Sequence, residues 1–146
     1  MSVNWIYNGK EFTEDDIGDN YGYVYIIKNK TNDRKYIGKK FFYSLRTKVI
    51  KGKKKKLKLS SDWKTYYGSN EELKKDVLEL GKENFTREII HLCRSKGECG
   101  YLEAKEQFLR GVLESDQYYN VWLMCRIRKS HIKEYNARIS ERIEWR

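Results

Sequence analysis

The architecture expected of this chain follows from residues 22 to 39, Gly22-Tyr23-Val24-Tyr25-Ile26-Ile27-Lys28-Asn29-Lys30-Thr31-Asn32-Asp33-Arg34-Lys35-Tyr36-Ile37-Gly38-Lys39. Both of its ends are rich in aromatic and β-branched residues, while its middle is polar and holds an Asn32-Asp33 pair where a chain can reverse. Two such segments around a short polar loop are typical of a β-hairpin. We therefore predict two antiparallel strands joined by a turn.

The first strand of this hairpin carries apolar side chains on both faces. Val24 and Ile26 point one way, and Tyr25 and Ile27 point the other way, because successive side chains alternate along a strand. A strand of this kind is covered on both sides, so we expect it in the interior of a sheet. In the returning strand, Gly38 lets the backbone bend or lets another group come close.

The composition favours one domain with a polyanionic partner. The chain has 146 residues, which can bury a real core, and its formal net charge of +10 is not needed for folding. Nucleic acid is the simplest partner, with a membrane surface as the other option. We see no apolar run long enough to span a bilayer and no signal peptide, so we expect no membrane partner. The three cysteines form no CxxC pair, which favours free thiols in a reducing cytoplasm over a zinc site.

A strongly basic run, Lys51-Gly52-Lys53-Lys54-Lys55-Lys56-Leu57-Lys58, follows the hairpin. Like charges repel, so we expect a mobile loop in the free chain. A solvated loop and a localisation tag are alternatives to the functional interpretation, which is binding to a phosphate backbone through counterion release. The candidate DNA-binding residues are Lys39, Lys40, Lys51, Lys53, Lys54, Lys55, Lys56 and Lys58.

Three further elements are predicted around this run. Residues 40–46 are expected to form a helix or turn packed on the sheet. Ser69 or Asn70 is a good N-cap for a helix from Glu71 to Leu80, and Gly81 ends it. Residues 84–92 follow as a third strand.

A second anchor of the sequence is a helix predicted from Ser95 or Gly100 to Glu114. At about 100° per residue its apolar side chains fall in one arc, and Glu106 lies at the margin of that arc. A carboxylate at the margin of a core needs a partner, and a salt bridge is the simplest one. The arc consists of Tyr101, Leu102, Phe108, Leu109, Val112 and Leu113.

The hairpin resembles the paired signature of the GIY-YIG nuclease family. Val24-Tyr25 stands where the family has Ile-Tyr, Tyr36-Ile37-Gly38 is the second element, and Tyr23 takes the place of the first glycine. Arg46 lies eight residues past Gly38, at the spacing at which the family carries its catalytic arginine. A guanidinium suits that role because it grips a phosphate with two parallel hydrogen bonds and keeps its charge.

The resemblance extends past the third strand. Glu106-Gln107-Phe108 is similar to the family's metal-binding glutamate motif, with Glu103 as the second choice. Asn120, after two tyrosines, is similar to an asparagine that supports the site, although a turn-forming asparagine is the alternative. Many family members carry a histidine or tyrosine four residues after the arginine, and this chain has Ile50 there.

The resemblance implies an α/β (α+β) fold, in which a three-stranded antiparallel sheet is flanked by helices. We assign residues 21–121 to this nuclease domain, with a lysine-rich insertion at 51–58. Residues 1–20 form an N-terminal arm, and residues 122–146 form a basic C-terminal extension. The extension has a short strand expected at 121–128 and then a helical stripe, and it is suited to docking on the body, pairing in a homodimer or touching DNA. The stripe consists of Ile132, Tyr135, Ile139 and Ile143.

The mechanism that the resemblance implies uses one Mg²⁺ ion, with Mn²⁺ as an alternative, held by Glu106 at the scissile phosphate. Arg46 neutralises charge in the transition state, Tyr25 orients or deprotonates the attacking water, and Tyr36 bonds the phosphate or the water. A tyrosine pKa is about 10, so a base role for Tyr25 requires a lowered pKa, which neighbouring cations would favour. Gly38 has a structural role in the motif.

Three functions fit these expectations. The first is a DNA endonuclease that hydrolyses phosphodiester bonds, encoded by a phage or mobile element as a homing or host-DNA-degrading enzyme, in the cytoplasm of a bacterial host cell. The second is a restriction or structure-specific repair nuclease, and the third is a nucleic-acid-binding module that does not cleave. The tyrosine–arginine–glutamate set favours the enzymes, because binding alone needs no carboxylate.

Overall fold

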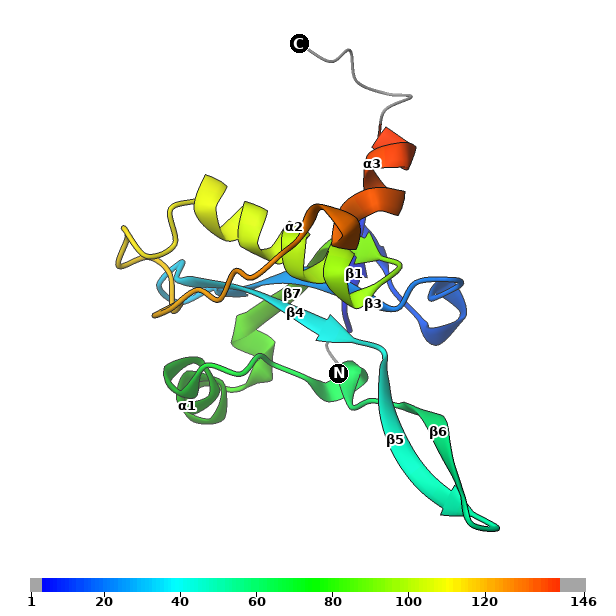
Figure 1. Ribbon diagram of the computed structural model, residues 1–146. Helices are drawn as coiled ribbons and strands as arrows, with labels where there is room; N and C mark the ends of the chain where they lie inside the picture. The colour runs from blue at the N-terminus through cyan, green and yellow to red at the C-terminus, as the bar shows by residue number, and fades with distance from the viewer. Residues whose placement is uncertain (1–3, 140–146) are drawn as a thin grey trace.

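The computed structural model describes residues 4–139, and within them a five-stranded sheet has the order β2-β1-β7-β3-β4 (Figure 1). β3 (Gly22–Asn29) is antiparallel to both β4 (Lys35–Phe41) and β7 (Phe85–Cys93). These three strands are the antiparallel core that the sequence predicts, and the mixed α and β class is confirmed. The sequence does not predict β1 (Ile6–Tyr7) or β2 (Lys10–Glu11). The sheet therefore has five strands, and the predicted total of three is wrong.

The two additional strands come from the N-terminal arm. Asn8 and Gly9 adopt positive φ angles of 51° and 77°, which is the backbone of a tight hairpin turn. β1 then pairs in parallel with β7, through Ile6 opposite Glu88 and Tyr7 opposite Ile89. Trp5 is 1% exposed, so the arm is anchored in the core by a large aromatic side chain.

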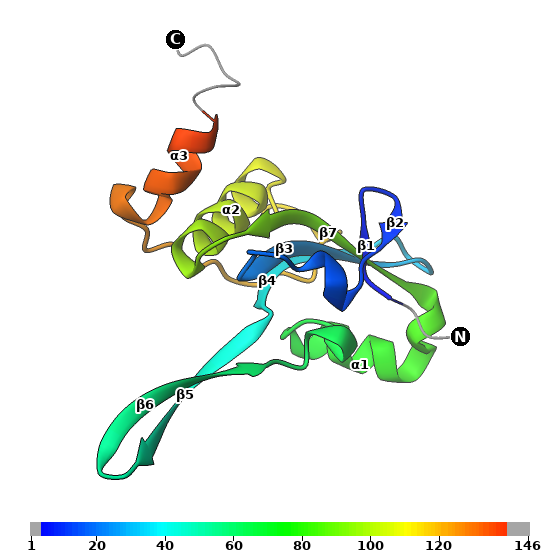
Figure 2. The ribbon, with the colours of Figure 1, turned by 90° about the vertical axis from the view of Figure 1, so that its right-hand side faces the viewer.

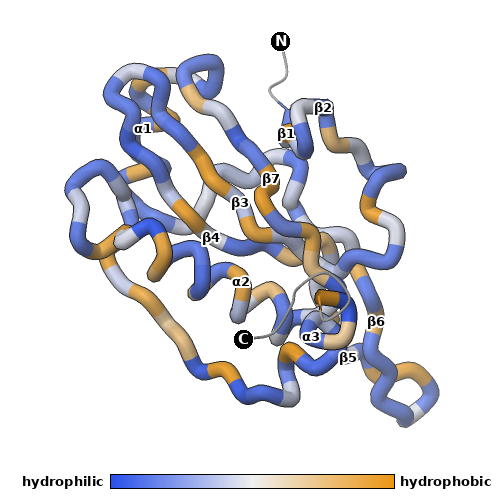
Figure 3. The backbone as a smooth tube through the Cα atoms, turned by 90° about the horizontal axis from the view of Figure 1, so that it is seen from above, coloured by the Kyte–Doolittle hydropathy of each residue, from blue (hydrophilic) through white to orange (hydrophobic). Residues whose placement is uncertain are grey.

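The predicted hairpin is β3–β4, and its register places Tyr25 opposite Gly38. β3 lies inside the sheet, and its side chains alternate as predicted between two cores. Tyr23, Tyr25 and Ile27 enter the larger, aromatic cluster, while Val24 packs in the second cluster. Figure 3 shows hydrophobic residues along β3 and β7.

Each face of the sheet is covered by one helix (Figure 2). α1 (Glu71–Leu80) buries Leu73 and Val77 on the aromatic side, and α2 (Lys96–Leu109) buries Cys99 and Leu102 on the other side. The Asn70 side chain accepts a hydrogen bond from the Leu73 amide at 2.9 Å, so α1 has the predicted cap and bounds.

α2 departs from its prediction at its C-terminal end. The helix stops at Leu109, and Gly111 follows with a φ of +59°. Phe108 and Leu109 are 64% and 72% exposed, so the apolar arc expected through them does not form. Val112 and Leu113, which helped to define that arc, lie beyond the helix and no longer follow its period.

The basic run is a strand, and the expectation of a mobile loop is wrong. β5 (Tyr43–Ile50) and β6 (Lys53–Ser60) pair along their whole length and project from the body (Figures 1 and 2). The helix or turn expected over residues 40–46 is also wrong, because β4 and β5 occupy them. Lys51 and Gly52 form the turn with φ angles of 51° and 76°.

Alternation explains why a lysine-rich strand is tolerated here. Successive lysines of β6 point to opposite faces, and most of them sit opposite neutral residues such as Leu45, Thr47 and Val49. Within the described hairpin, Lys48 opposite Lys55 is the one cross-strand pair of like charge.

Short 3₁₀ segments connect the larger elements, namely η1 (Glu14–Asp16), η2 (Trp63–Thr65) and η3 (Lys82–Asn84). After α2, residues 121–128 run without the short strand that was expected there. η4 (Lys129–Ile132) and α3 (Lys133–Ile139) follow, and the Tyr135 ring packs 6.0 Å from that of Tyr101 on α2. Ile143, the last residue of the predicted stripe, lies outside the described residues. No helix within residues 4–139 has the length and apolarity to cross a membrane.

Candidate active site

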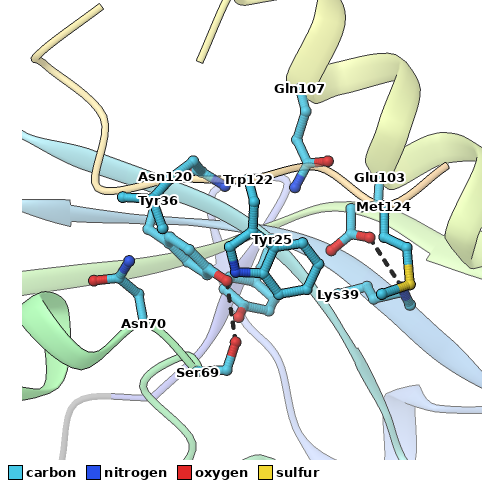
Figure 4. A pocket seen from close by; sticks show the side chains of 11 residues that line it. Tyr25, Tyr36, Lys39, Ser69, Asn70, Glu103, Gln107, Asn120, Trp122 and Met124 are labelled. Carbon is cyan, nitrogen blue, oxygen red and sulfur yellow. Dashed lines mark hydrogen bonds and ion pairs between the residues drawn. The ribbon is translucent and has the colours of Figure 1, made fainter. Parts of the chain in front are cut away.

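A cavity of about 330 Å³ opens where the β3–β4 hairpin, α2, the loop before α1 and the chain after Asn120 meet (Figure 4). It holds polar groups of several kinds: phenols, a carboxylate, an ammonium group, amides and a hydroxyl. It is lined by Tyr25, Tyr36, Lys39, Ser69, Asn70, Glu103, Gln107, Asn120, Val121, Trp122 and Met124.

Gly38, which has no side chain, leaves the space that the Tyr25 phenol occupies. A Cβ atom at Gly38 would lie 2.4 Å from the Tyr25 hydroxyl oxygen, closer than any real contact. Gly68, with a φ of +91°, also approaches this oxygen, and a Cβ atom there would lie 3.5 Å from it. The second motif glycine is therefore explained by the close approach of the tyrosine on the neighbouring strand.

The two motif tyrosines are held as neutral phenols. Burial raises the pKa of Tyr25 well above its ordinary value, and the neighbouring Tyr66 and Tyr36 add to the rise. Burial also raises the pKa of Tyr36, whose hydroxyl lies 3.1 Å from the Ser69 Oγ. At neutral pH both phenols therefore carry their protons, and the lowered pKa that a base role for Tyr25 would need is absent from this arrangement.

Hydrogen bonds from Asn120 attach the segment after α2 to β4, the strand that carries Tyr36, Ile37 and Gly38. Its Oδ1 accepts from the Ile37 amide at 3.1 Å, and its Nδ2 donates to the Ile37 carbonyl at 2.8 Å. Gln107 Nε2 donates to the same carbonyl at 3.1 Å. β4 is an edge strand, so these side chains satisfy backbone groups that no further strand pairs with.

Glu103 is the carboxylate of the cavity. Its Oε1 lies 2.9 Å from Lys39 Nζ, and its side chain is 15% exposed. Among the described residues, Oε2 has no hydrogen-bond partner. Figure 4 shows the Glu103 and Lys39 side chains converging on one side of the cavity, with Tyr36 and Ser69 on the other.

Glu106 does not line the cavity. Its Oε1 is 2.8 Å from His91 Nε2 on β7, and its Oε2 accepts from Arg110 Nε at 3.0 Å. Burial alone would raise the pKa of Glu106, but the hydrogen bonds from His91 and Arg110 outweigh it and lower the pKa. The structure thus gives Glu106 the salt-bridge partners that any carboxylate at the core margin needs, and it does not bring Glu106 to the tyrosines.

Arg46 is also separate from the cavity lining. It lies on β5 opposite Leu57 and is exposed, as are the lysines of the projecting hairpin. Lys40 bonds Asp62 at 2.6 Å and lies over the Tyr66 ring, while Lys39 alone of the predicted DNA-binding lysines lines the cavity. Ile50, at the end of β5, is 37% exposed.

Residues 5–123 match the family model described as "Putative endonuclease segE, GIY-YIG domain". The chain belongs to this family. Most of the described fold lies within the match, including the cavity residues up to Trp122. The chain thus carries a GIY-YIG endonuclease domain, which is a nuclease domain. No curated protein and no solved structure gave a significant match to the chain.

The chemistry of this GIY-YIG site fits a hard divalent cation. Within residues 4–139 no three His, Cys, Asp or Glu side chains cluster, and the cysteines at 93, 99 and 125 are free thiols, so a caged zinc site has no ligands here. Glu103 instead offers one carboxylate in an open, polar cavity. Mg²⁺ is commonly held by one or two carboxylates, with water and substrate phosphate completing its shell.

Sequence reasoning missed six residues that line the GIY-YIG cavity, namely Ser69, Asn70, Gln107, Val121, Trp122 and Met124. A signal for one of them exists, because Glu103 and Gln107 are spaced i and i+4 and therefore share a helix face. Ser69 and Trp122 lie in connecting segments, where sequence periodicity gives no direction for a side chain.

Proposed function

We propose that this GIY-YIG chain is a metal-dependent DNA endonuclease that hydrolyses phosphodiester bonds. The observation that carries the proposal is the convergence of the Glu103 carboxylate, the Lys39 ammonium and the Tyr25 and Tyr36 phenols on one cavity at the motif hairpin. The net charge of +10 supports a polyanionic substrate. Binding alone would not need a carboxylate inside such a positive surface.

Glu103, in place of Glu106, is the residue proposed to hold Mg²⁺ or Mn²⁺. Within residues 4–139 its Oε2 has no hydrogen-bond partner, whereas both oxygens of Glu106 are engaged by His91 and Arg110. A bound divalent ion supplies Lewis-acid stabilisation of negative charge on the scissile phosphate and the departing oxygen.

The other side chains of the cavity orient the phosphate and the water. Tyr25 and Tyr36 keep their protons, so they donate hydrogen bonds to phosphate oxygens or hold the attacking water. Lys39 offsets the charge that grows on the phosphate. A base role for Tyr25 would require cations in the loaded site to reverse the upward shift of its pKa.

Arg46 is proposed to grip a phosphate from outside the cavity. Its position on β5 is two residues beyond the hairpin root at Ser44, and that root borders the same surface as Lys39 and Lys40. There the Arg46 guanidinium would bind a DNA phosphate next to the scissile one through two parallel hydrogen bonds. Arg46 thus keeps the phosphate-binding role expected from the motif spacing, although it does not line the cavity.

A phage or mobile-element origin, with DNA in the cytoplasm of a bacterial host cell as the substrate, is the biological setting that we propose. The test of the biochemical function is incubation of the purified chain with supercoiled plasmid in Mg²⁺, Mn²⁺ or EDTA. We expect nicked or linear plasmid with either metal and none with EDTA. Binding without cleavage in both metals would overturn the proposal in favour of a non-cleaving module.

A further inference from the structure

The β5–β6 hairpin is a separate structural unit beside the active site. It forms its own two-stranded sheet, which is not hydrogen-bonded to the five-stranded sheet. It extends away from the body in both ribbon views (Figures 1 and 2). An isolated two-stranded ribbon is only marginally stable in water. A projecting ribbon of this kind is therefore suited to gain stability by packing against a binding partner.

The hairpin carries most of the chain's excess charge. Among residues 43–60, eight are Lys or Arg and none is Asp or Glu. Without these eight cations, the net charge of +10 would fall to +2. None of the eight forms an ion pair with another residue of the described chain, so their charge is available to a polyanion.

Both faces of the ribbon are positive. Lys54, Lys56 and Lys58 share one face with Leu45, Thr47 and Val49, because directly opposed residues of an antiparallel pair point the same way. The other face holds Arg46, Lys48, Lys53 and Lys55. A ribbon lying flat on a phosphate backbone would use one charged face, whereas a ribbon inserted between two backbones would use both.

The dimensions of the ribbon suit the major groove of B-form DNA. Each strand has eight residues, which at a rise of about 3.3 Å gives a ribbon of about 26 Å. The major groove is about 12 Å wide and admits a two-stranded β-ribbon, while the minor groove is about half as wide. Leu45 and Val49 are 48% and 64% exposed, so apolar side chains are also presented to whatever the ribbon enters.

We propose that the β5–β6 hairpin inserts into the major groove of duplex DNA beside the scissile phosphate, an inference that rests on the proposed nuclease function for its substrate. Lys39 lines the active-site cavity and also a second hollow that it shares with Tyr43, Ser44 and Leu45 at the hairpin root. The ribbon and the cavity therefore meet the same duplex. Double-stranded RNA is a poor partner for the ribbon, because the major groove of an RNA helix is too deep and narrow to admit it.

The test compares three proteins by their binding to a duplex DNA fragment in EDTA, where no cleavage occurs. The first is the wild type. The second lacks residues 47–50 and 53–56, which pair with one another, so Arg46 and Leu57 flank the retained Lys51-Gly52 turn in the original register. The third keeps the ribbon but has Lys→Gln at 48, 53, 54, 55 and 56, the same five charges that the shortened chain loses.

Groove-specific competitors distinguish insertion from surface attachment. Methyl green occupies the major groove and distamycin occupies the minor groove. We expect methyl green to weaken wild-type binding by about tenfold, distamycin to have little effect, and the shortened chain to be insensitive to both. The Lys→Gln chain should remain sensitive to methyl green, while the slope of log K against log salt falls by about four in magnitude.

The outcomes separate this inference from the proposed function. Displacement of the wild type by distamycin but not by methyl green would overturn the inference, as would a shortened chain that binds like the wild type at every salt concentration. Failure of plasmid cleavage in both metals would overturn the nuclease proposal and leave the groove result standing. The Lys→Gln chain retains every backbone position, so it keeps the test decisive if the shortened chain misfolds.

Discussion

Lys39 on β4 and Glu103 on α2 form an ion pair of 2.9 Å that joins the motif hairpin to the helix at the edge of the active-site cavity. Glu106, three positions further along the same helix, bonds instead to His91 on β7. α2 thus directs Glu103 to β4 and Glu106 to β7, and of these two carboxylates only Glu103 lines the cavity that also contains the motif tyrosines.

Replacing Lys39 by alanine is expected to lower the cleavage rate by about 10²-fold, because the cavity loses the cation that offsets charge on the phosphate. Lys40→Ala is the matched control, since Lys40 bonds Asp62 and lies over Tyr66 outside the cavity. Single-turnover plasmid cleavage at saturating protein measures both. Equal losses in the two variants would show that general charge, and not the position of Lys39, supports the reaction.

Gly38→Ala should destabilise the fold by about 1–3 kcal/mol, because the added methyl group would overlap the Tyr25 hydroxyl. Tyr25→Phe removes that oxygen. The closest overlap is then gone, while ring carbons of residue 25 at 2.7 Å and of Tyr36 at 2.9 Å still crowd the methyl group. We therefore expect partial relief, with the double variant more stable than the sum of the two single changes predicts. Urea denaturation of the four proteins gives the coupling energy, and strict additivity would argue against the contact.

Glu106→Gln should lower the free energy of unfolding by about 1 kcal/mol at pH 7, because charged bonds to His91 and Arg110 are lost. The folded-state pKa of Glu106 is lowered. Its contribution is therefore present above the unfolded pKa and disappears as pH falls through the folded pKa. Urea denaturation from pH 7 to the acid range should show the two proteins converging, and a constant difference would contradict the assignment.

Trp122 is 64% exposed at the cavity and is expected to stack on a nucleobase next to the cleaved bond. Trp122→Ala should raise KM about tenfold with little change in kcat, and Trp122→Phe should preserve KM. In a Trp145→Phe background, DNA binding should also quench tryptophan fluorescence, and adding Trp122→Phe should remove the quenching, since the remaining Trp5 and Trp63 are buried. A lower KM in the alanine variant would indicate that Trp122 covers the cavity.

The sequence was sufficient for elements whose patterns are local. The β3–β4 hairpin, the cap and bounds of α1, and β7 follow from alternation, a capping asparagine and a terminal glycine. The family assignment is confirmed by the match over residues 5–123. It rests on an ordered set of residues and not on any one motif, namely Tyr25, Tyr36, Gly38, Arg46, Glu106 and Asn120.

The remaining features depend on non-local contacts. The run of lysines predicts a loop, because neighbouring positive charges repel one another. It forms a strand instead, because pairing with β5 places neutral residues opposite most of the lysines. The choice between Glu103 and Glu106 depended on where α2 ends, and the apolar arc included Val112 and Leu113, which the helix never reaches. Arg46 fits the motif spacing, but the hairpin insertion carries it away from the cavity lining.

The most direct test compares Glu103→Gln with Glu106→Gln in plasmid cleavage over a Mg²⁺ titration, with EDTA as the blank. Both changes keep the size of the side chain and remove one negative charge from the same helix. The account predicts that Glu103→Gln abolishes cleavage at every Mg²⁺ concentration, while Glu106→Gln cleaves at close to the wild-type rate once folded. Loss of cleavage in Glu106→Gln with activity retained in Glu103→Gln would contradict it.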